Sequence, residues 1–385
     1  MVLFLHNRYR STGGEERAVE DLMWLVREHL QERAELLERD SASLGRARAA
    51  AGLLRGGLAP AEVARAVRGG GARVVHAHNL QPAFGWRALA AARAAGARVV
   101  VHLHQYRLVC AIGVCFTRGA ECTRCHARDT LPGVRLNCRG SVGEALAYGT
   151  SLALWQRRLV EQADAVIVPS VFARERLREL GAPLCWERVH VLAPPLRESA
   201  FTSGAGDLRG SDGPGSDSAV GSYALVVARL APEKGVDVAI DACRMAGIPL
   251  VVAGDGPEAE TLARRAGGDG GVRFVGRVDD VELAALRAGA AIALAPSRSG
   301  ETFGLALAEA MAAGVPVVAS RVGAFPELVD QSALVAPGDA SALAGAIARL
   351  AGDRAAGERG RERVRALCAP AVVARALADV YDAST

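Results

Sequence analysis

The chain has 385 residues, half of them apolar, which is too long for one ordinary core and suits two domains. No window approaches the ~20 apolar residues of a membrane span, and the segment before His6 is too short for the apolar core of a signal peptide. These features exclude a membrane-spanning protein. We expect a soluble, cytoplasmic chain, with peripheral contact at the inner face of a membrane still open.

The formal net charge of +4 is unevenly divided. Residues 1–195 carry 27 Arg against 18 Asp and Glu, a net +9, and the remainder carries 19 basic against 24 acidic residues, a net −5. A solvated arginine-rich surface fits this pattern, and so does a face for an anionic partner such as a membrane or a phosphorylated acceptor. Nucleic acid is not expected, because no basic run is interleaved with aromatic residues.

The first half alternates short apolar runs with helical patterns. Residues 2–6 predict a strand, and residues 15–30 predict an amphipathic helix. An alanine-rich helix is expected at 84–95. Four further strands are expected at 73–78, 98–104, 165–170 and 188–192. Their Val and Ile runs are continuous rather than alternating, which is typical of parallel strands covered on both faces.

The loop after the first predicted strand carries two glycines. The stretch HNRYRSTGGEERAVE (6–20) leads from that strand into the first helix. Gly13 and Gly14 allow the backbone to approach a ligand closely at the N-terminus of this helix. We therefore expect ligand contacts here.

Five of the eight cysteines fall between residues 110 and 138. Cys122 and Cys125 form a Cys-x2-Cys pair flanked by Cys110 and Cys138, a spacing found among metal ligands. A structural zinc on these four would staple the loop 105–140, which lacks a core of its own. Cys115 would be spare, and His126 could substitute for one of the ligands. Reduced free cysteines and a redox or disulfide role are the alternatives, although a cytoplasmic location disfavours disulfides.

A second α/β pattern begins after residues 196–221, which are rich in Gly, Ser and Asp and predict a flexible linker. Helices are expected at 235–246 and 304–313. The predicted strands are 223–229, 250–255, 272–276, 291–297 and 315–320. The repeated pattern predicts two Rossmann-like doubly wound domains, 1–195 and 222–365, that face each other across a cleft. Residues 366–385 predict a C-terminal helix that packs back toward the first domain.

The only lysine of the chain, Lys234, lies in the stretch VARLAPEKGVD. Arg229 ends a predicted strand and Lys234 precedes a predicted helix, so both cations lie at a strand's carboxyl end beside a helix N-terminus. Such a helix end favours anions, and the two cations predict a phosphate site. The alternative is a surface lysine paired with Glu233 or Asp237.

A second ligand-binding stretch is SRSGETFGLALAEAMAAGVPVVAS (297–320). Glu301 lies in a loop, the amides that follow it start a helix, and Glu309 comes eight residues later on that helix. Carboxylates accept hydrogen bonds from sugar hydroxyls, while the helix amides suit an anion. Together these features predict a nucleotide-sugar pocket.

These motifs resemble family GT4 of the GT-B glycosyltransferases. ARLAPEKG, VVAGDGPE, FVGRV and ETFGLALAEAMAAGVPVVAS occur in the family's order, with its E-x7-E motif at Glu301 and Glu309. The first half resembles a GT4 subgroup with an N-terminal HN-x-Y and Gly-Gly-Glu. LHQYRLVC is similar to that subgroup's LHNYRLLC, with Gln105 in place of Asn. RAGAAIAL (287–294) departs from the family's usual Ala-Asp.

The resemblance implies a retaining transferase that moves a sugar from a UDP- or GDP-sugar to a hydroxyl acceptor in surface polysaccharide or glycolipid assembly, with lipid-linked acceptors among the candidates. It implies that Arg229 and Lys234 hold the donor diphosphate, and that Glu309 binds the ribose. Glu301 and His104 would contact the transferred sugar. Further implied contacts are Gly13, Gly14, Gly254, Arg277, Thr302, Phe303, Gly304 and Leu305.

No cofactor is expected for catalysis, because the two cations and the helix amides already supply positive charge to the leaving group. A nucleotide-sugar epimerase and a non-catalytic nucleotide-sugar binder are the alternatives on the same fold. The E-x7-E segment disfavours the first, and the intact set of charged residues disfavours the second.

Overall fold

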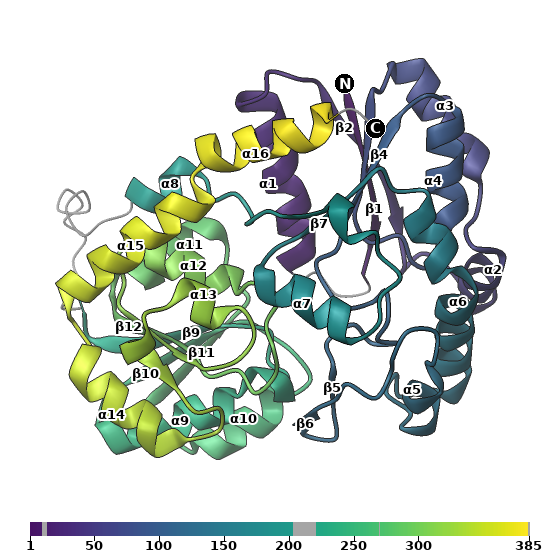
Figure 1. The fold of residues 1–385 in the computed structure, drawn as a ribbon. Coiled ribbons are helices and arrows are strands. Elements are labelled where there is room, and N and C mark those ends of the chain that lie inside the picture. The colour runs from purple at the N-terminus through teal and green to yellow at the C-terminus, as the bar shows by residue number, and fades with distance from the viewer. Residues whose placement is uncertain (10–13, 203–220, 269, 384–385) are drawn as a thin grey trace. The chain divides into compact units, whose positions relative to one another are not determined.

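A computed structural model describes residues 1–9, 14–202, 221–268 and 270–383 (Figure 1). The chain divides into two compact units. Unit 1 comprises Met1–Thr117, Cys122–Pro195 and Pro370–Thr385, and unit 2 comprises Arg118–Glu121 and Leu196–Ala369. No helix in the described ranges combines the length and apolar character needed to cross a membrane.

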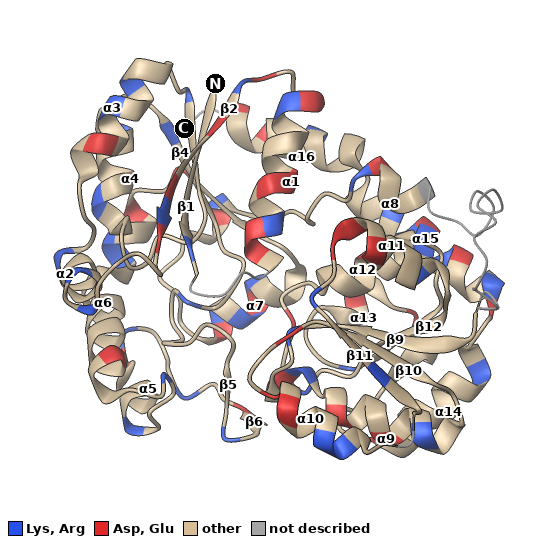
Figure 2. Cartoon of the chain, turned by 180° about the vertical axis from the view of Figure 1, so that it is seen from behind, with Lys and Arg blue, Asp and Glu red and all other residues tan. Residues whose placement is uncertain are grey.

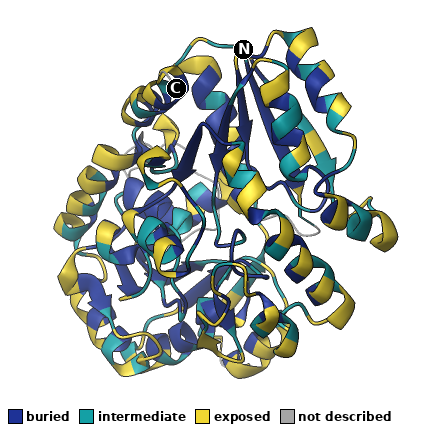
Figure 3. Cartoon of the chain, turned by 45° about the vertical axis from the view of Figure 1, so that its right-hand side comes forward, coloured by how far each residue is buried: buried dark blue, intermediate teal, exposed yellow. Residues whose placement is uncertain are grey.

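Unit 1 is built on a six-stranded parallel sheet in the order β2-β1-β3-β4-β7-β8. Its inner strands are buried on both faces because helices cover both sides (Figure 3). The strands are β1 (Val2–Arg8), β2 (Ala34–Asp40), β3 (Val74–Ala77), β4 (Arg98–His102), β7 (Ala165–Val168) and β8 (Val189–Val191).

Unit 1 also contains α-helices that pack on this sheet and on one another. They are α1 (Gly14–Glu28), α2 (Arg46–Arg55), α3 (Pro60–Gly70), α4 (Gly85–Ala94), α5 (Leu131–Arg135), α6 (Val142–Glu161), α7 (Val171–Glu179) and α16 (Pro370–Asp382), with a 3-10 turn at Trp186–Arg188. The loop between β4 and α6 also holds two short strands, β5 (Phe116–Thr117) and β6 (Ala120–Glu121).

The C-terminal helix α16 completes the core on one face of the unit 1 sheet. Its Val373, Leu377 and Val380 pack in one cluster with Leu22 and Val26 of α1. Its Tyr381 donates or accepts a hydrogen bond at Nδ1 of a buried histidine of β3. Residues more than 300 positions apart therefore share one core.

Strand β2 was not among the predicted strands. Four of its seven residues are charged, and exposed positions alternate with more buried ones along it. It is an edge strand of the sheet, so its outer side contacts water. An edge strand needs no continuous apolar run, which explains why the sequence pattern did not reveal it.

Unit 2 contains a second six-stranded parallel sheet, in the order β11-β10-β9-β12-β13-β14. The strands are β9 (Tyr223–Val227), β10 (Leu250–Ala253), β11 (Val272–Gly276), β12 (Ala290–Ala295), β13 (Val317–Ser320) and β14 (Leu334–Val335). All five strands predicted for this half are present. The two-residue edge strand β14 is too short to leave a sequence pattern.

Three helices of unit 2 begin at aspartate caps. Asp279, Asp339 and Asp353 each accept a hydrogen bond from a backbone amide three residues on, and so start α11, α14 and α15. The helices are α8 (Glu198–Thr202), α9 (Val236–Ala246), α10 (Ala259–Ala266), α11 (Asp280–Ala288), α12 (Leu305–Ala312), α13 (Phe325–Leu328), α14 (Ala340–Leu350) and α15 (Arg354–Cys368), with 3-10 turns at Pro232–Lys234 and Gln331–Ala333. Of the predicted linker 196–221, residues 198–202 form α8, and residues 203–220 lie outside the described residues.

Each sheet has one point where the strand order reverses. In unit 2, the chain runs from β9 outward to β11 and then returns to β12 on the other side of β9. In unit 1, β2 and β3 flank β1 in the same way. Ligands of open α/β sheets bind at such points, outside the carboxyl ends of the strands. The predicted cleft between the two domains stays a prediction.

The packing of α16 predicts a position-dependent stability effect. Leu377→Ala removes a fully buried side chain and should lower the unfolding free energy by about 2–5 kcal/mol. Val372→Ala on the same helix should have little effect, because its side chain is 45% exposed. Urea unfolding of both variants measures the difference, and equal effects would contradict this role of α16.

Candidate active site

Lys234 lies at the reversal point of the unit 2 sheet. The chain leaves β9 at Val227 and reaches α9 through the 3-10 turn that ends at Lys234. Gly235 follows with φ 64°, and a Cβ there would lie 2.1 Å from the carbonyl oxygen of Pro296, just after β12. Only glycine fits such a position, so the loops after β9 and β12 pack directly against each other.

This packing brings Lys234 to Glu301. The lysine Nζ lies 2.5 Å from Oε1 of Glu301, and the Ser297 hydroxyl donates to the same oxygen at 2.8 Å. Burial alone raises the pKa of Glu301, but the charge of Lys234 and the two hydrogen bonds hold that pKa below its ordinary value. Glu301 is therefore a carboxylate that faces the only ammonium side chain of the protein.

The neighbouring charges have partners of their own. Arg229 lies 2.5 Å from Glu233, and Arg298 binds both oxygens of Asp237 at 2.6 Å. The two acids considered as surface partners of Lys234 are thus paired with arginines. Arg229 remains 49% exposed at the side chain, next to the turn that carries Lys234.

Glu309 lies on α12, where its carboxylate forms a buried ion pair with Arg287 of α11. Both side chains are less than 10% exposed. Sequence reasoning missed Arg287, although it lies at the start of RAGAAIAL, a stretch that departs from the family pattern. Removing Glu309 would leave the Arg287 charge buried without this partner. A loss of function in such a variant would therefore combine an effect on ligand binding with an effect on protein stability.

The remaining predicted donor contacts lie at the ends of the unit 2 strands. Gly304 begins α12 with φ 98°, where a Cβ would lie 2.4 Å from the Phe325 ring. Gly254 follows β10, and Arg277 follows β11. Thr302, Phe303 and Leu305 flank the N-terminus of α12. The parallel strands place these residues at the same end of the sheet, beyond the carboxyl ends of the strands.

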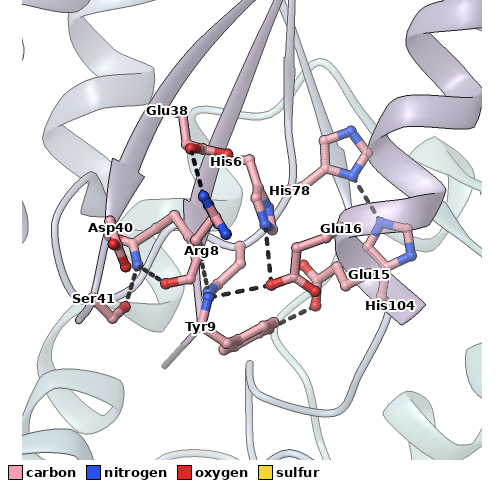
Figure 4. Close-up of polar contacts among 12 residues, drawn as sticks. His6, Arg8, Tyr9, Glu15, Glu16, Glu38, Asp40, Ser41, His78 and His104 are labelled. Carbon is pink, nitrogen blue, oxygen red and sulfur yellow. Dashed lines mark hydrogen bonds and ion pairs between the residues drawn. The ribbon is translucent and has the colours of Figure 1, made fainter. Parts of the chain in front are cut away.

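Unit 1 carries a polar cluster at its own reversal point (Figure 4). The Tyr9 hydroxyl donates to Glu15 at 2.6 Å, and the Tyr9 amide donates to Glu16 at 3.3 Å. The predicted residue His104 follows β4, and its Nε2 lies 2.7 Å from Nδ1 of His78, which follows β3. Gly14 is the first residue of α1, whereas Gly13 lies outside the described residues.

A row of stacked histidines extends from His104 into the core. The His102 and His104 rings are 4.1 Å apart, and His76 stacks on His102 at 5.4 Å. Burial lowers the pKa of each: to about 3 for His76, well below the ordinary value for His78 and His102, and to a smaller extent for His104, where Glu15 and Glu16 oppose it. These side chains are neutral at pH 7.

Among the described residues, His76, His78 and His102 form the one group of potential metal ligands whose ligand atoms lie within 4.8 Å of one another. Their rings are nearly parallel, with interplanar angles between 9° and 28°. An imidazole binds a metal in its own ring plane, and nearly parallel planes share no such point. The trio therefore fits a packed, neutral stack better than a metal centre.

A pocket opens beside His78 and His104 in unit 1. Its polar wall is formed by Tyr9, Glu15, His78, His104, Gln105 and Arg107. Its apolar wall includes Leu53, Leu80, Trp86, Leu152, Trp155 and Leu159, from α2, α4, α6 and the loop after β3. No sequence motif revealed this pocket, because the two tryptophans lie far apart in the chain and meet only where α4 packs on α6.

A second, smaller cavity lies in the loop between β4 and α6. Cys110, Cys115, Cys122, Cys125 and Cys138 all line it, and all eight cysteines of the chain are free thiols. Hydrogen bonds from the Cys115 thiol and from three backbone amides lower the pKa of Cys110 to about 6, against the opposing effect of burial. Burial raises the pKa of Cys125 to about 11.

Comparison with known families accounts for most of the chain. A model described as a glycosyl transferase 4-like domain matches residues 14–195, and one described as glycosyl transferases group 1 matches residues 221–353. Together the two models place the chain among the glycosyltransferases. This assignment confirms the predicted resemblance, while the N-terminal HN-x-Y and Gly-Gly-Glu motif stays untested.

Two curated relatives of this glycosyltransferase share part of its length. A phosphatidyl-myo-inositol mannosyltransferase of Mycobacterium leprae is 39% identical over 127 residues, 31% of this chain and 34% of the relative. A glycogen synthase of Mycobacterium tuberculosis is 33% identical over 238 residues, 58% of this chain and 55% of the relative. The chain thus spans about a third to about half of these relatives.

Solved structures match over the full length. Anabaena HepE in complex with UDP and glucose aligns with a TM-score of 0.67 and 20% identity, covering 100% of this chain and 99% of that one. Sucrose-phosphate synthase of Thermosynechococcus elongatus gives 0.67 and 20%, covering 99% and 98%. These matches confirm the predicted GT-B fold.

The histidine row predicts acid sensitivity. The pKa values of His76, His78 and His102 are lowered on folding, so their contribution to stability is complete above pH 6.5 and is lost as pH falls below it. Each should lower the unfolding free energy by about 1.4 kcal/mol per pH unit in that range. Urea unfolding at pH 7.5, 6.5 and 5.5 measures the slope.

A matched pair of variants isolates this effect. His76→Phe should flatten the slope, because Phe cannot be protonated and fits among the rings that already stack with Phe4. His29→Gln, at an exposed position, should leave the slope unchanged. An unchanged slope in His76→Phe would contradict the account.

Proposed function

We propose that this protein transfers a sugar, with retention of configuration, from a nucleoside-diphosphate sugar to a hydroxyl acceptor. The observation that carries the proposal is the Lys234–Glu301 pair at the reversal point of the unit 2 sheet. A cation and a carboxylate at the place where α/β sheets bind ligands suit the two ends of such a donor. Family membership and the UDP bound in the HepE structure support the same donor class.

The pair has a defined task when a donor binds. Lys234 and Arg229 turn to the diphosphate, whose negative charge replaces their carboxylate partners. The amides at the N-terminus of α12 offer the same phosphates further donors. Glu301, still held by Ser297, accepts a hydrogen bond from a hydroxyl of the transferred sugar. Glu309 is proposed to bind the ribose hydroxyls while Arg287 holds its carboxylate in place.

The proposed reaction breaks the bond between the anomeric carbon and the phosphate oxygen and forms one to the acceptor oxygen on the same face. The acceptor's proton passes to the departing phosphate oxygen, so charge builds on the diphosphate in the transition state. Lys234 and Arg229 stabilise that charge in a site that is already partly shielded from water. The step needs no further base.

The pocket of unit 1 suits an acceptor that joins a hydroxyl to an apolar body. Trp86, Trp155 and the leucines form the apolar wall, and His78 and His104 mark the polar end. A neutral His104 can accept or donate a hydrogen bond without adding charge. The mannosyltransferase relative of M. leprae is named for phosphatidyl-myo-inositol, and this name supports a lipid-linked acceptor here.

The surface around this pocket supports peripheral membrane contact. Arginines recur on α2, α3, α4 and α6 (Figure 2). Leu54 on α2 and Leu146 and Leu154 on α6 are about half exposed, and Arg46 and Arg48 on α2 are exposed as well. Exposed leucines among arginines suit the interface of an anionic membrane. We propose that the protein takes its acceptor at such a surface, in polysaccharide or glycolipid assembly.

Lys234 provides the test of the donor site. Lys234→Ala and Lys234→Arg should each reduce turnover by about 100-fold or more, because a planar guanidinium does not replace a compact ammonium at the leaving group. Release of nucleoside diphosphate and product mass are measured with a panel of UDP- and GDP-sugars. Arg354→Ala, at an exposed site in the same unit, serves as the control.

Three outcomes separate the candidate functions. Transfer to an acceptor or to water supports the proposal. A changed sugar with intact diphosphate would indicate an epimerase, and binding without either change would indicate a non-catalytic binder. If the wild type neither binds nor hydrolyses any nucleotide sugar in the panel, the proposal is wrong.

The apolar wall generates a second test. Trp155→Ala should raise the KM for the acceptor by about 10-fold or more, as expected for a lost aromatic contact of about 1.5–3 kcal/mol, and should leave the KM for the donor unchanged. Trp186→Ala, outside the pocket, is the control. A change in the donor KM alone would show that the pocket does not hold the acceptor.

A further inference from the structure

The cysteine-lined cavity has no part in the proposed transfer, yet five of the eight cysteines meet there. The loop that forms it contains only β5, β6 and the five-residue helix α5 as regular structure. Its other lining residues are Ala111, Ile112, Phe116, Thr117, Pro132, Gly133 and Leu136, none of them charged. Thiolates formed in this cavity would therefore have no cation among the lining side chains.

Backbone amides point at two of the sulfurs. Cys110 receives hydrogen bonds from the amides of Ile112, Gly113 and its neighbour Cys115. Cys125 receives them from the amides of Ala111 and Gly133. Amide donors stabilise sulfur that carries negative charge, as ligand sulfur does in a metal site.

Glycine allows one of these contacts. A Cβ on Gly133 would lie 3.0 Å from the Ala111 side chain and 3.5 Å from the Cys125 sulfur. A larger residue would crowd the Ala111 side chain beside the cavity. The turn after Cys110 similarly depends on Gly113, which has φ 84°.

We propose that Cys110, Cys122, Cys125 and Cys138 bind one structural zinc ion. In structural sites, zinc is bound by four protein ligands. A Cys-x2-Cys pair such as Cys122 and Cys125 supplies two of them from one turn. Cys115 remains the hydrogen-bonding neighbour of the Cys110 sulfur. Among the described residues, the ligand atoms of the histidine trio all lie within 4.8 Å of one another, but the sulfurs of these cysteines do not. Zinc binding therefore requires the cysteine side chains to rotate about χ1 toward the cavity.

The site would also hold one wall of the acceptor pocket. Gln105, Arg107 and Leu108 line that pocket and lead directly into Cys110. Farther along the loop, the Ala127 carbonyl accepts a hydrogen bond of 2.7 Å from Gln156, a pocket residue of α6. Zinc binding would therefore fix both ends of this wall.

Metal content tests the proposal without reference to catalysis. The full chain is expressed with added zinc, purified without chelator and measured by mass spectrometry of the metal. We expect one zinc per chain, lost in Cys125→Ser and Cys122→Ser. Cys115→Ser, inside the cavity, and Cys243→Ser, a buried cysteine of unit 2, should both keep it.

A measurement on the wild type covers the case in which a variant fails to fold. Cobalt added to metal-free protein should give the charge-transfer absorption of a tetrahedral thiolate site. Four thiols should resist alkylation until a chelator is added. Absence of bound zinc together with absence of the cobalt band would overturn the proposal, as would loss of zinc from Cys243→Ser to the same extent as from Cys125→Ser.

Discussion

The contact between the loop after β9 and the loop after β12 is the constraint on which the proposed donor site depends. Gly235 fits against the Pro296 carbonyl where no side chain could, and this fit places Lys234 within 2.5 Å of Glu301 across 67 residues of chain. A partly buried ion pair gains little free energy by itself, because desolvation offsets the attraction. The pair instead holds Lys234 and Glu301 in position, so that a ligand can take the place of each residue as the partner of the other.

Unit 1 has neutral histidines, rather than a charged pair, at its reversal point. There the reversal point is surrounded by neutral histidines, whose burial lowers their pKa values, and the nearby carboxylates Glu15 and Glu16 bind Tyr9. Neutral histidines beside an apolar pocket suit an uncharged hydroxyl, whereas the charged pair of unit 2 suits a diphosphate. In the proposed function, donor and acceptor therefore bind at sites of different electrostatics.

The sequence predicted the parts that depend on local pattern. Buried parallel strands need continuous apolar runs, so β1, β3, β4, β7 and the first five strands of unit 2 could be read directly. Edge strand β2 could not, because one side of it contacts water. The partner of Lys234, the Arg287–Glu309 pair and the tryptophan pocket also escaped, since each joins residues from separate elements and depends on how helices and loops pack.

The single lysine makes the central claim directly measurable. Protein labelled with isotope only at lysine gives one side-chain signal by NMR, that of Lys234. We predict that UDP and a bound UDP- or GDP-sugar shift this signal strongly, because the ammonium exchanges Glu301 for phosphate, and that the nucleoside alone does not. A nucleotide sugar that binds in calorimetry and leaves the lysine signal in place would contradict the account.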